Sequence, residues 1–114
     1  MKDDCIFCKI VNKEISADIL KENPEAILIK DKNPKAPHHV LAMSKEHSSH
    51  IGEVLFAGDI LSPLALLCEY AYDNKLDKSG FRIVTNAGPD AGQTVGHYHI
   101  HLLGGAKLKD DFGV

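Results

Sequence analysis

The clearest alternation of polar and apolar positions in the chain lies in residues 97–103. Three histidines alternate there with apolar residues, in the order His-Tyr-His-Ile-His-Leu-Leu. Successive side chains of a β-strand point to opposite faces, so this run predicts a strand with three imidazoles on one face and an apolar opposite face. A glycine-containing segment precedes the run and Gly104-Gly105 ends it, as is typical of a strand between turns.

Other short apolar runs predict further strands in residues 18–21, 26–30, 38–43 and 81–85. The first two runs are separated by Asn23-Pro24-Glu25. Proline presets the backbone for the corner of a turn, so these two strands are expected to form a β-hairpin.

Helices are predicted in two places. Residues 60–75 carry apolar positions at spacings of three and four, which indicates a long helix with one buried stripe. Pro63 is acceptable in the first turn of a helix, so the start is expected between residues 59 and 62. A short helix is expected in residues 5–13. The buried stripe of the long helix is predicted to consist of Leu64, Leu67, Cys68 and Ala71.

Together these elements predict one α+β domain spanning residues 1–114. The expected architecture is a mainly antiparallel sheet of about five strands, with the long and the short helix packed against it. The length of 114 residues suits a single hydrophobic core.

Charge and composition argue against several classes of partner and location. The formal net charge is −3 and there is no basic block, which argues against a nucleic-acid partner. Arg82 is the only arginine, so a phosphate site would rely on imidazoles, backbone N–H groups and small polar side chains. The first residues lack the apolar core of a secretory signal, and no run approaches the roughly 20 apolar residues of a membrane span. We therefore expect a cytoplasmic protein.

The loop before the three histidines carries candidate anion-binding groups. Gly88 and Gly92 lie in it, followed by Gln93 and Thr94. Glycine lets backbone N–H groups approach an anion, and threonine offers a hydroxyl donor. Imidazole, with an ordinary pKa of about 6.5, is mostly neutral at pH 7 and has a lone pair that can attack phosphorus. A plain connecting loop, a solvated histidine face and a histidine-only metal site remain alternatives.

These motifs resemble those of the histidine triad (HIT) superfamily, and most closely its Hint branch of purine nucleoside phosphoramidases. The resemblance rests on the triad, on Gly92-Gln93-Thr94 before it, on the start Cys5-Ile6-Phe7-Cys8-Lys9-Ile10 and on residues 36–41. It implies a HIT-like fold whose sheet continues across a homodimer. It also implies hydrolysis of nucleoside 5′-phosphoramidates or related conjugates to the nucleoside monophosphate, through a nucleotidyl-histidine intermediate.

The resemblance implies a role for each histidine. His99 corresponds to the nucleophile, and His101 to the residue that contacts phosphate and assists the leaving group. His97 corresponds to the orienting member, expected to be held by His39. Asp31 corresponds to the residue that binds the ribose hydroxyls. The phosphate and leaving-group side is implied to include Asn86, Gly92, Gln93 and Thr94, and an apolar purine pocket Ile6, Phe7, Ile10, Ile29 and Leu41.

A second constellation is the pair Cys5-x-x-Cys8. Its spacing suits zinc, which needs two further ligands. The HIT relatives that bind zinc imply His47 and His97 as those ligands, with His50 as a substitute for His47. Such a zinc would be structural, because attack of a histidine on phosphorus needs no metal cofactor. The alternative is a pair of reduced cysteines packed in a small helix.

The sequence is compatible with two alternative functions. A dinucleoside polyphosphate hydrolase of the Fhit type is the alternative enzyme, and a nucleotide-binding regulatory module with little turnover is the alternative outside enzymes. Gly96 and Lys32 depart from residues usual in the family, and the tail 106–114 lacks the Trp-Pro-Pro ending of animal members. In those members the tail reaches the site of the partner subunit.

Overall fold

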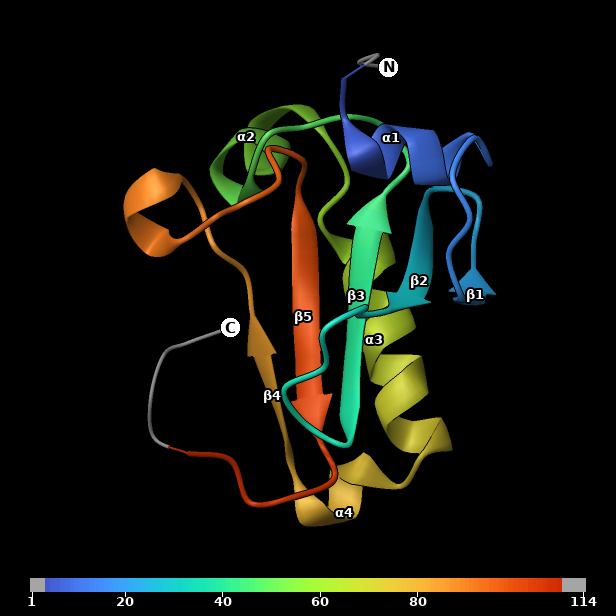
Figure 1. Ribbon diagram of the computed structural model, residues 1–114, viewed down its shortest axis with the longest axis vertical. Coiled ribbons are helices and arrows are strands. Elements are labelled where there is room, and N and C mark those ends of the chain that lie inside the picture. The colour runs from blue at the N-terminus through green and yellow to red at the C-terminus, as the bar shows by residue number, and fades with distance from the viewer. Residues whose placement is uncertain (1–3, 110–114) are drawn as a thin grey trace.

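The computed structural model describes residues 4–109, which form a five-stranded antiparallel sheet with helices on both faces (Figure 1). The order of the strands in the sheet is β1-β2-β3-β5-β4. This confirms the predicted α+β class. The strands are β1 Ile19–Glu22, β2 Ala26–Lys30, β3 His38–Ser44, β4 Phe81–Val84 and β5 His99–Gly104.

The two faces of the sheet bury two separate hydrophobic clusters. Alternate residues of β2, β3 and β5 pack against the long helix α3 (Leu61–Asp73), which runs behind the sheet in Figure 1. The other residues of β2 and β3 pack against the short helix α1 (Ile6–Val11) on the opposite face. The alternation along β5 follows the same rule, because Tyr98, Ile100 and Leu102 lie in the α3 cluster. The histidines therefore belong to the α1 face.

The long helix begins where Pro63 predicts, but its buried stripe is turned relative to the expected one. Pro63, Leu66, Leu67 and Ala71 are its buried residues. Leu64 and Cys68 are only partly buried. The prediction was wrong for these two because a spacing of three and four marks a helix face, whereas the centre of the buried face depends on where the sheet lies.

Three shorter helical segments were not predicted. They are α2 (Ile51–Ala57), α4 (Leu76–Ser79) and the single 3₁₀ turn η1 (Pro89–Ala91). Helix α2 lacks the periodic spacing of apolar residues that predicts a helix with one buried face. Two of its apolar residues, Leu55 and Phe56, are exposed, and Phe56 is 89% accessible.

The predicted strand at the triad is also shifted. It was expected to begin at residue 97, whereas β5 begins at His99. Residue 97 instead precedes the strand, and its backbone N–H donates to the carbonyl of Val95. Residues 1–3 and 110–114, which include part of the tail discussed above, lie outside the described residues. Within residues 4–109, no helix has both the length and the apolar character needed to span a bilayer.

Candidate functional site

The site is assembled on the α1 face of the sheet where β3 and β5 pair. Leu41 lies opposite His101 and Met43 opposite His99 in this antiparallel pair. The Phe7 ring of α1 contacts His99 edge-on, with ring centroids 4.9 Å apart. The loop after β2 crosses in front of β3 and β5 (Figure 1) and brings Asp31 to the same place. Side chains far apart in sequence thus converge on one face.

The protonation of His99 is fixed by the backbone. Its Nδ1 lies 2.7 Å from the carbonyl oxygen of His97, so Nδ1–H is the donor of this bond. The remaining nitrogen, Nε2, then carries a lone pair and has no hydrogen-bond partner among residues 4–109. The ring is 6% exposed and therefore held in one orientation. The ring of His99 is thus held in an orientation in which a neutral imidazole can use the Nε2 lone pair for nucleophilic attack.

His101 is oriented through His39. The backbone N–H of Lys35 donates to Nδ1 of His39 at 3.1 Å, so the proton of the neutral His39 ring sits on Nε2. That Nε2–H donates to Nδ1 of His101 at 3.0 Å, which leaves the proton of His101 on its own Nε2. The expected contact between His39 and His97 is wrong. His39 pairs with His101 because the β3–β5 register places residue 39 opposite 103, at the far end of β5 from residue 97.

His97 turns toward α1 and away from the triad pair. Its Nε2 lies 2.7 Å from the carbonyl oxygen of Ser44, so Nε2–H donates there and Nδ1 carries the lone pair. This Nδ1 lies 3.3 Å from Sγ of Cys5 and 3.5 Å from Sγ of Cys8. His47 contributes its own Nδ1 at 3.3 Å from Sγ of Cys8. His50 lies elsewhere, where its Nδ1 accepts from the backbone N–H of Gly52 and caps α2.

These four ligand atoms fit a tetrahedral zinc ion. Cys5, Cys8, His47 and His97 bring two sulfur and two nitrogen atoms within 4.8 Å of one another. Tetrahedral Zn²⁺ with ordinary bond lengths holds sulfur and nitrogen ligands about 3.6 Å apart. The bond from His97 to the Ser44 carbonyl supplies the outer hydrogen bond that zinc-bound histidines have. This set has the chemistry of a structural Cys₂His₂ site.

A second close group consists of Asp31, His39 and His101, and its protonation suits a metal less well than that of the Cys₂His₂ cluster. Their candidate ligand atoms also lie within 4.8 Å of one another. A histidine that binds metal through one nitrogen donates from the other. The other nitrogen of His39 accepts from Lys35 N–H instead, so the nitrogen that faces the group carries a proton. This arrangement favours a hydrogen-bonded relay over a metal site.

Burial keeps the histidines of the site neutral. Desolvation lowers the pKa of His97 and of His101 to about 4. It also lowers the pKa of His39 and His99, although the nearby Asp31 carboxylate acts in the opposite direction on both. A neutral imidazole has one donor nitrogen and one acceptor nitrogen. Once the partner of one nitrogen is known, the position of the proton on each of these rings is therefore determined.

The loop between β4 and β5 is built around Gln93. The side-chain Oε1 of Gln93 accepts from Gly88 N–H at 2.8 Å, and Nε2 donates to the carbonyls of Ser49 and Val95. Gly88 and Gly92 have φ of +88° and +85°, a region that favours glycine. Gln93 therefore ties the loop to the segment before α2. Thr94 is exposed and Asn86 half-buried.

The remaining expected substrate residues gather on the α1 side. Asp31 accepts from Asn33 N–H through Oδ1, and its Oδ2 lies 3.3 Å from His39 Nε2. The side chain of Asp31 is 17% exposed, so the carboxylate stays accessible. Of the expected purine pocket, Phe7, Ile10, Ile29 and Leu41 are buried together in the α1 cluster, and Ile6 is 42% exposed.

Three backbone contacts of the site were missed from the sequence. The Ser44 carbonyl fixes His97, the Lys35 N–H fixes His39, and the Thr85 hydroxyl donates to the carbonyl of His99 at 2.7 Å. The first two use main-chain atoms, which every residue has, so residue identity carries no signal for them.

Comparison with known proteins places this geometry in a family. The model of the HIT domain matches residues 12–108. A HIT-like protein of Synechococcus elongatus is 38% identical over 109 residues, covering 95% of this chain and 96% of that protein. A histidine triad protein from Clostridium difficile has a TM-score of 0.90 at 36% identity, covering 97% of this chain and 98% of that one.

A HIT family hydrolase from Clostridium thermocellum is a further structural match. It is 37% identical with a TM-score of 0.81, over 97% of this chain and 98% of its own. The chain therefore belongs to the HIT domain family, as the triad and the motifs around it indicated.

Proposed function

We propose that this protein hydrolyses nucleoside 5′-phosphoramidates or related nucleotidyl conjugates, releasing the nucleoside monophosphate. The observation that carries the proposal is the set of hydrogen bonds that fixes a lone pair on Nε2 of His99 and a proton on Nε2 of His101. The two rings are adjacent, with centroids 5.1 Å apart. The hydrolase named among the structural matches supports the same class of reaction.

In the first step, His99 Nε2 attacks the α-phosphorus and the phosphorus–nitrogen bond of the substrate breaks. The anionic phosphate raises the pKa of the adjacent His101, so this ring takes up a proton from solvent when substrate binds and becomes an imidazolium. The imidazolium then gives one proton to the departing amine and is left as a neutral ring. In the second step, water attacks phosphorus and gives a proton to His101, and the bond to His99 breaks. The nucleoside monophosphate leaves and His99 is regenerated.

The remaining residues have proposed positioning roles. Asp31 binds the ribose hydroxyls through its accessible carboxylate. The loop with Asn86, Gly92 and Thr94 lies beside the phosphate and the leaving group, while the Gln93 amide holds that loop in place. The purine lies against Ile6 and the edge of the α1 cluster. A cytoplasmic location stays a prediction from the sequence.

A direct comparison of substrates tests the reaction class. We expect faster turnover of an adenosine 5′-phosphoramidate than of a diadenosine polyphosphate, measured by chromatographic release of AMP. A preference for the dinucleotide would place the protein with the Fhit type instead. Tight AMP binding without turnover of either would indicate a regulatory nucleotide-binding module.

Replacing Lys35 by proline tests the relay behind His101. Proline lacks the N–H that fixes the His39 ring, so His39 can place its proton on the wrong nitrogen and His101 loses its orientation. We expect kcat for the phosphoramidate to fall at least about tenfold. Lys35→Ala keeps the N–H and removes the ammonium group, and it should keep most of kcat. Equal losses in both variants would assign the effect to the charge.

The homodimer implied by the family is also proposed here. Strand β4 is an edge of the sheet formed by residues 4–109, with no strand paired on its outer side, and Ile83 on it is 39% exposed. On α3, Leu61 and Tyr72 are 68% and 67% exposed. A second copy that pairs with β4 would extend the sheet and remove this edge.

A charge on the β4 edge is expected to break the dimer. In Ile83→Lys the two lysines would approach each other across the two-fold axis, so like charges would meet in the new interface. Sedimentation analysis should show a shift from dimer toward monomer. Leu20→Lys adds the same charge to the opposite edge strand, β1, and should leave the dimer intact. A wild-type monomer at micromolar concentration would contradict the proposal.

A further inference from the structure

Asp31, His39 and His101 bring three polar atoms together in one small triangle. His39 Nε2 lies 3.0 Å from His101 Nδ1, and Oδ2 of Asp31 lies 3.3 Å from the first nitrogen and 3.9 Å from the second. The other carboxylate oxygen, Oδ1, accepts from Asn33 N–H at 2.8 Å, which holds the carboxylate in place. Binding of ribose hydroxyls does not account for an oxygen that faces two imidazole rings.

The proposed reaction creates a conflict between the two rings. While both are neutral, the Nε2–H of His39 donates to the lone pair on Nδ1 of His101. When His101 becomes an imidazolium, its second proton must go to Nδ1, because this nitrogen has the ring's lone pair. Two N–H groups would then point at each other across 3.0 Å.

His39 cannot remove this conflict by moving its own proton. With its proton on Nδ1, a neutral His39 would direct that N–H at the N–H of Lys35, which donates to Nδ1 at 3.1 Å. Both ring N–H groups therefore need another acceptor. The structure places Oδ2 of Asp31 beside them. A carboxylate has about four acceptor positions, enough for the Asn33 N–H, both ring N–H groups and one ribose hydroxyl.

We propose that Asp31 is a positioning residue that accepts the Nδ1–H of His101 whenever this ring carries that proton. This role rests on the proposed hydrolysis, in which the protonation of His101 changes at each step. When His101 takes up the proton, the N–H of His39 turns from His101 to Asp31, so that both rings donate to one carboxylate.

The same contact prepares His101 for the second step. After the Nε2 proton has gone to the departing amine, the bond from Nδ1–H to Asp31 keeps His101 in the tautomer with a lone pair on Nε2. That lone pair takes the proton of the attacking water. The Nδ1 proton returns to solvent when the product leaves, which restores the starting tautomer.

The charges around His101 support this role. The pKa of His101 is lowered to about 4, mainly by burial and also by the neighbouring His99 and His39 rings and the Lys35 ammonium. Among these neighbours, Asp31 is the one that raises the pKa. Removal of its charge should therefore lower the pKa of His101, so that less imidazolium is present at a given pH.

The test uses Asp31→Asn, whose amide oxygen can still accept from Asn33 N–H while its NH₂ group meets the rings with donors. The substrate is the 5′-phosphoramidate of 2′,3′-dideoxyadenosine, which has no ribose hydroxyls, so a loss in kcat is independent of ribose binding. In the wild type, kcat should fall as the pH rises through the pKa of His101 in the substrate complex. In Asp31→Asn we expect this fall at a pH lower by about one unit or more, and a kcat at pH 7 about tenfold lower.

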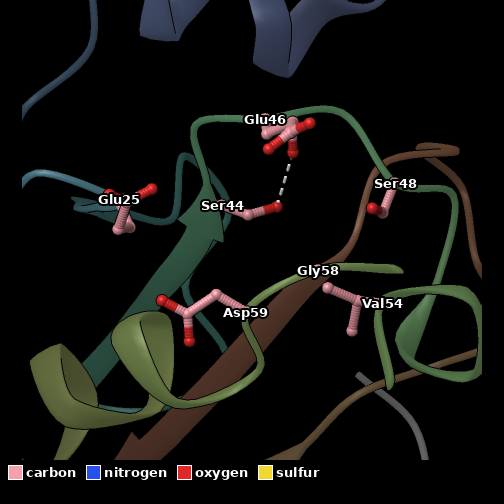
Figure 2. A pocket seen from close by; sticks show the side chains of 7 residues that line it. All are labelled: Glu25, Ser44, Glu46, Ser48, Val54, Gly58 and Asp59. Atoms are coloured by element: carbon pink, nitrogen blue, oxygen red, sulfur yellow. Dashed lines mark hydrogen bonds between the residues drawn. The ribbon is translucent and has the colours of Figure 1, made fainter. Parts of the chain in front are cut away.

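Glu25→Gln is the matched control, because Glu25 and Asp31 flank opposite ends of β2. Glu25 lines a small hollow with Ser44 at the end of β3 (Figure 2). Its distance from Asp31 along β2 is on the order of 20 Å, at which exposed charges are largely screened. The pH profile of this variant should match that of the wild type. A shift equal to that of Asp31→Asn would show a general effect of charge and overturn the proposal.

The protonation of His101 also gives a readout that needs no turnover. With AMP bound, nitrogen NMR of histidine-labelled protein should show a lower titration midpoint for His101 in Asp31→Asn than in the wild type. Equal pH profiles and equal midpoints would overturn the role of Asp31 and leave the hydrolysis standing. If the wild type binds AMP but hydrolyses no phosphoramidate, the proposed hydrolysis fails and the NMR midpoints still decide the role of Asp31. A wild type that binds no AMP would contradict both.

Discussion

Phosphoramidate hydrolysis is expected to fall by at least about a thousandfold in His99→Asn, because the variant lacks the nitrogen that attacks phosphorus. Asparagine is chosen since its side-chain amide can still donate to the His97 carbonyl, which His99 satisfies at 2.7 Å. The loss should appear in kcat, with AMP binding retained. Steady-state kinetics and calorimetric titration with AMP measure the two quantities separately.

The zinc expected at the cluster of Cys5, Cys8, His47 and His97 serves as the control for this variant. His97 lies two residues before the substitution, so a disturbed backbone would also lose the metal. A variant with full zinc and no turnover supports attack by His99. A variant that keeps more than about a tenth of wild-type kcat would exclude His99 as the nucleophile.

Loss of bound zinc and a fall in Tm on the order of 10 °C are expected for Cys8→Ser. The physical reason is that α1 has only six residues and is held to the sheet by the Cys₂His₂ group. Phe7 follows Cys5 on this helix and contacts His99, so activity should fall as well, though less than in His99→Asn. Metal analysis and thermal unfolding check the two outcomes.

Cys68→Ser is the matched control for this substitution. Cys68 is half-buried on α3 and outside the cluster, so this variant should keep one zinc per chain. Wild-type protein that contains no zinc after purification without chelators would contradict the site. A metal that is lost in His99 or His101 variants and retained in Cys8→Ser would instead indicate a metal site in the triad.

The elements with a strong local signal were predictable. Strand β2 matches the run 26–30, and α3 begins within the range that Pro63 allows. Helix α2 was not predictable, since its exposed Leu55 and Phe56 do not follow the pattern of a helix packed by one face. The family resemblance identified the histidines, Asp31 and the cysteines together, although Cys5 and His97, for example, are 92 positions apart in the chain.

The sequence by itself determined that three imidazoles share one side of the chain and that Cys5 and Cys8 have zinc spacing. Only the tertiary structure decided the partner of each ring. His97 faces the cysteines, His99 faces a carbonyl and His101 faces His39. The reason is that the protonated nitrogen of each ring is set by contacts with main-chain atoms of distant segments. Every residue has such main-chain atoms, so the type of residue at a position does not reveal these contacts. They depend on the register of the strands and the path of the loops.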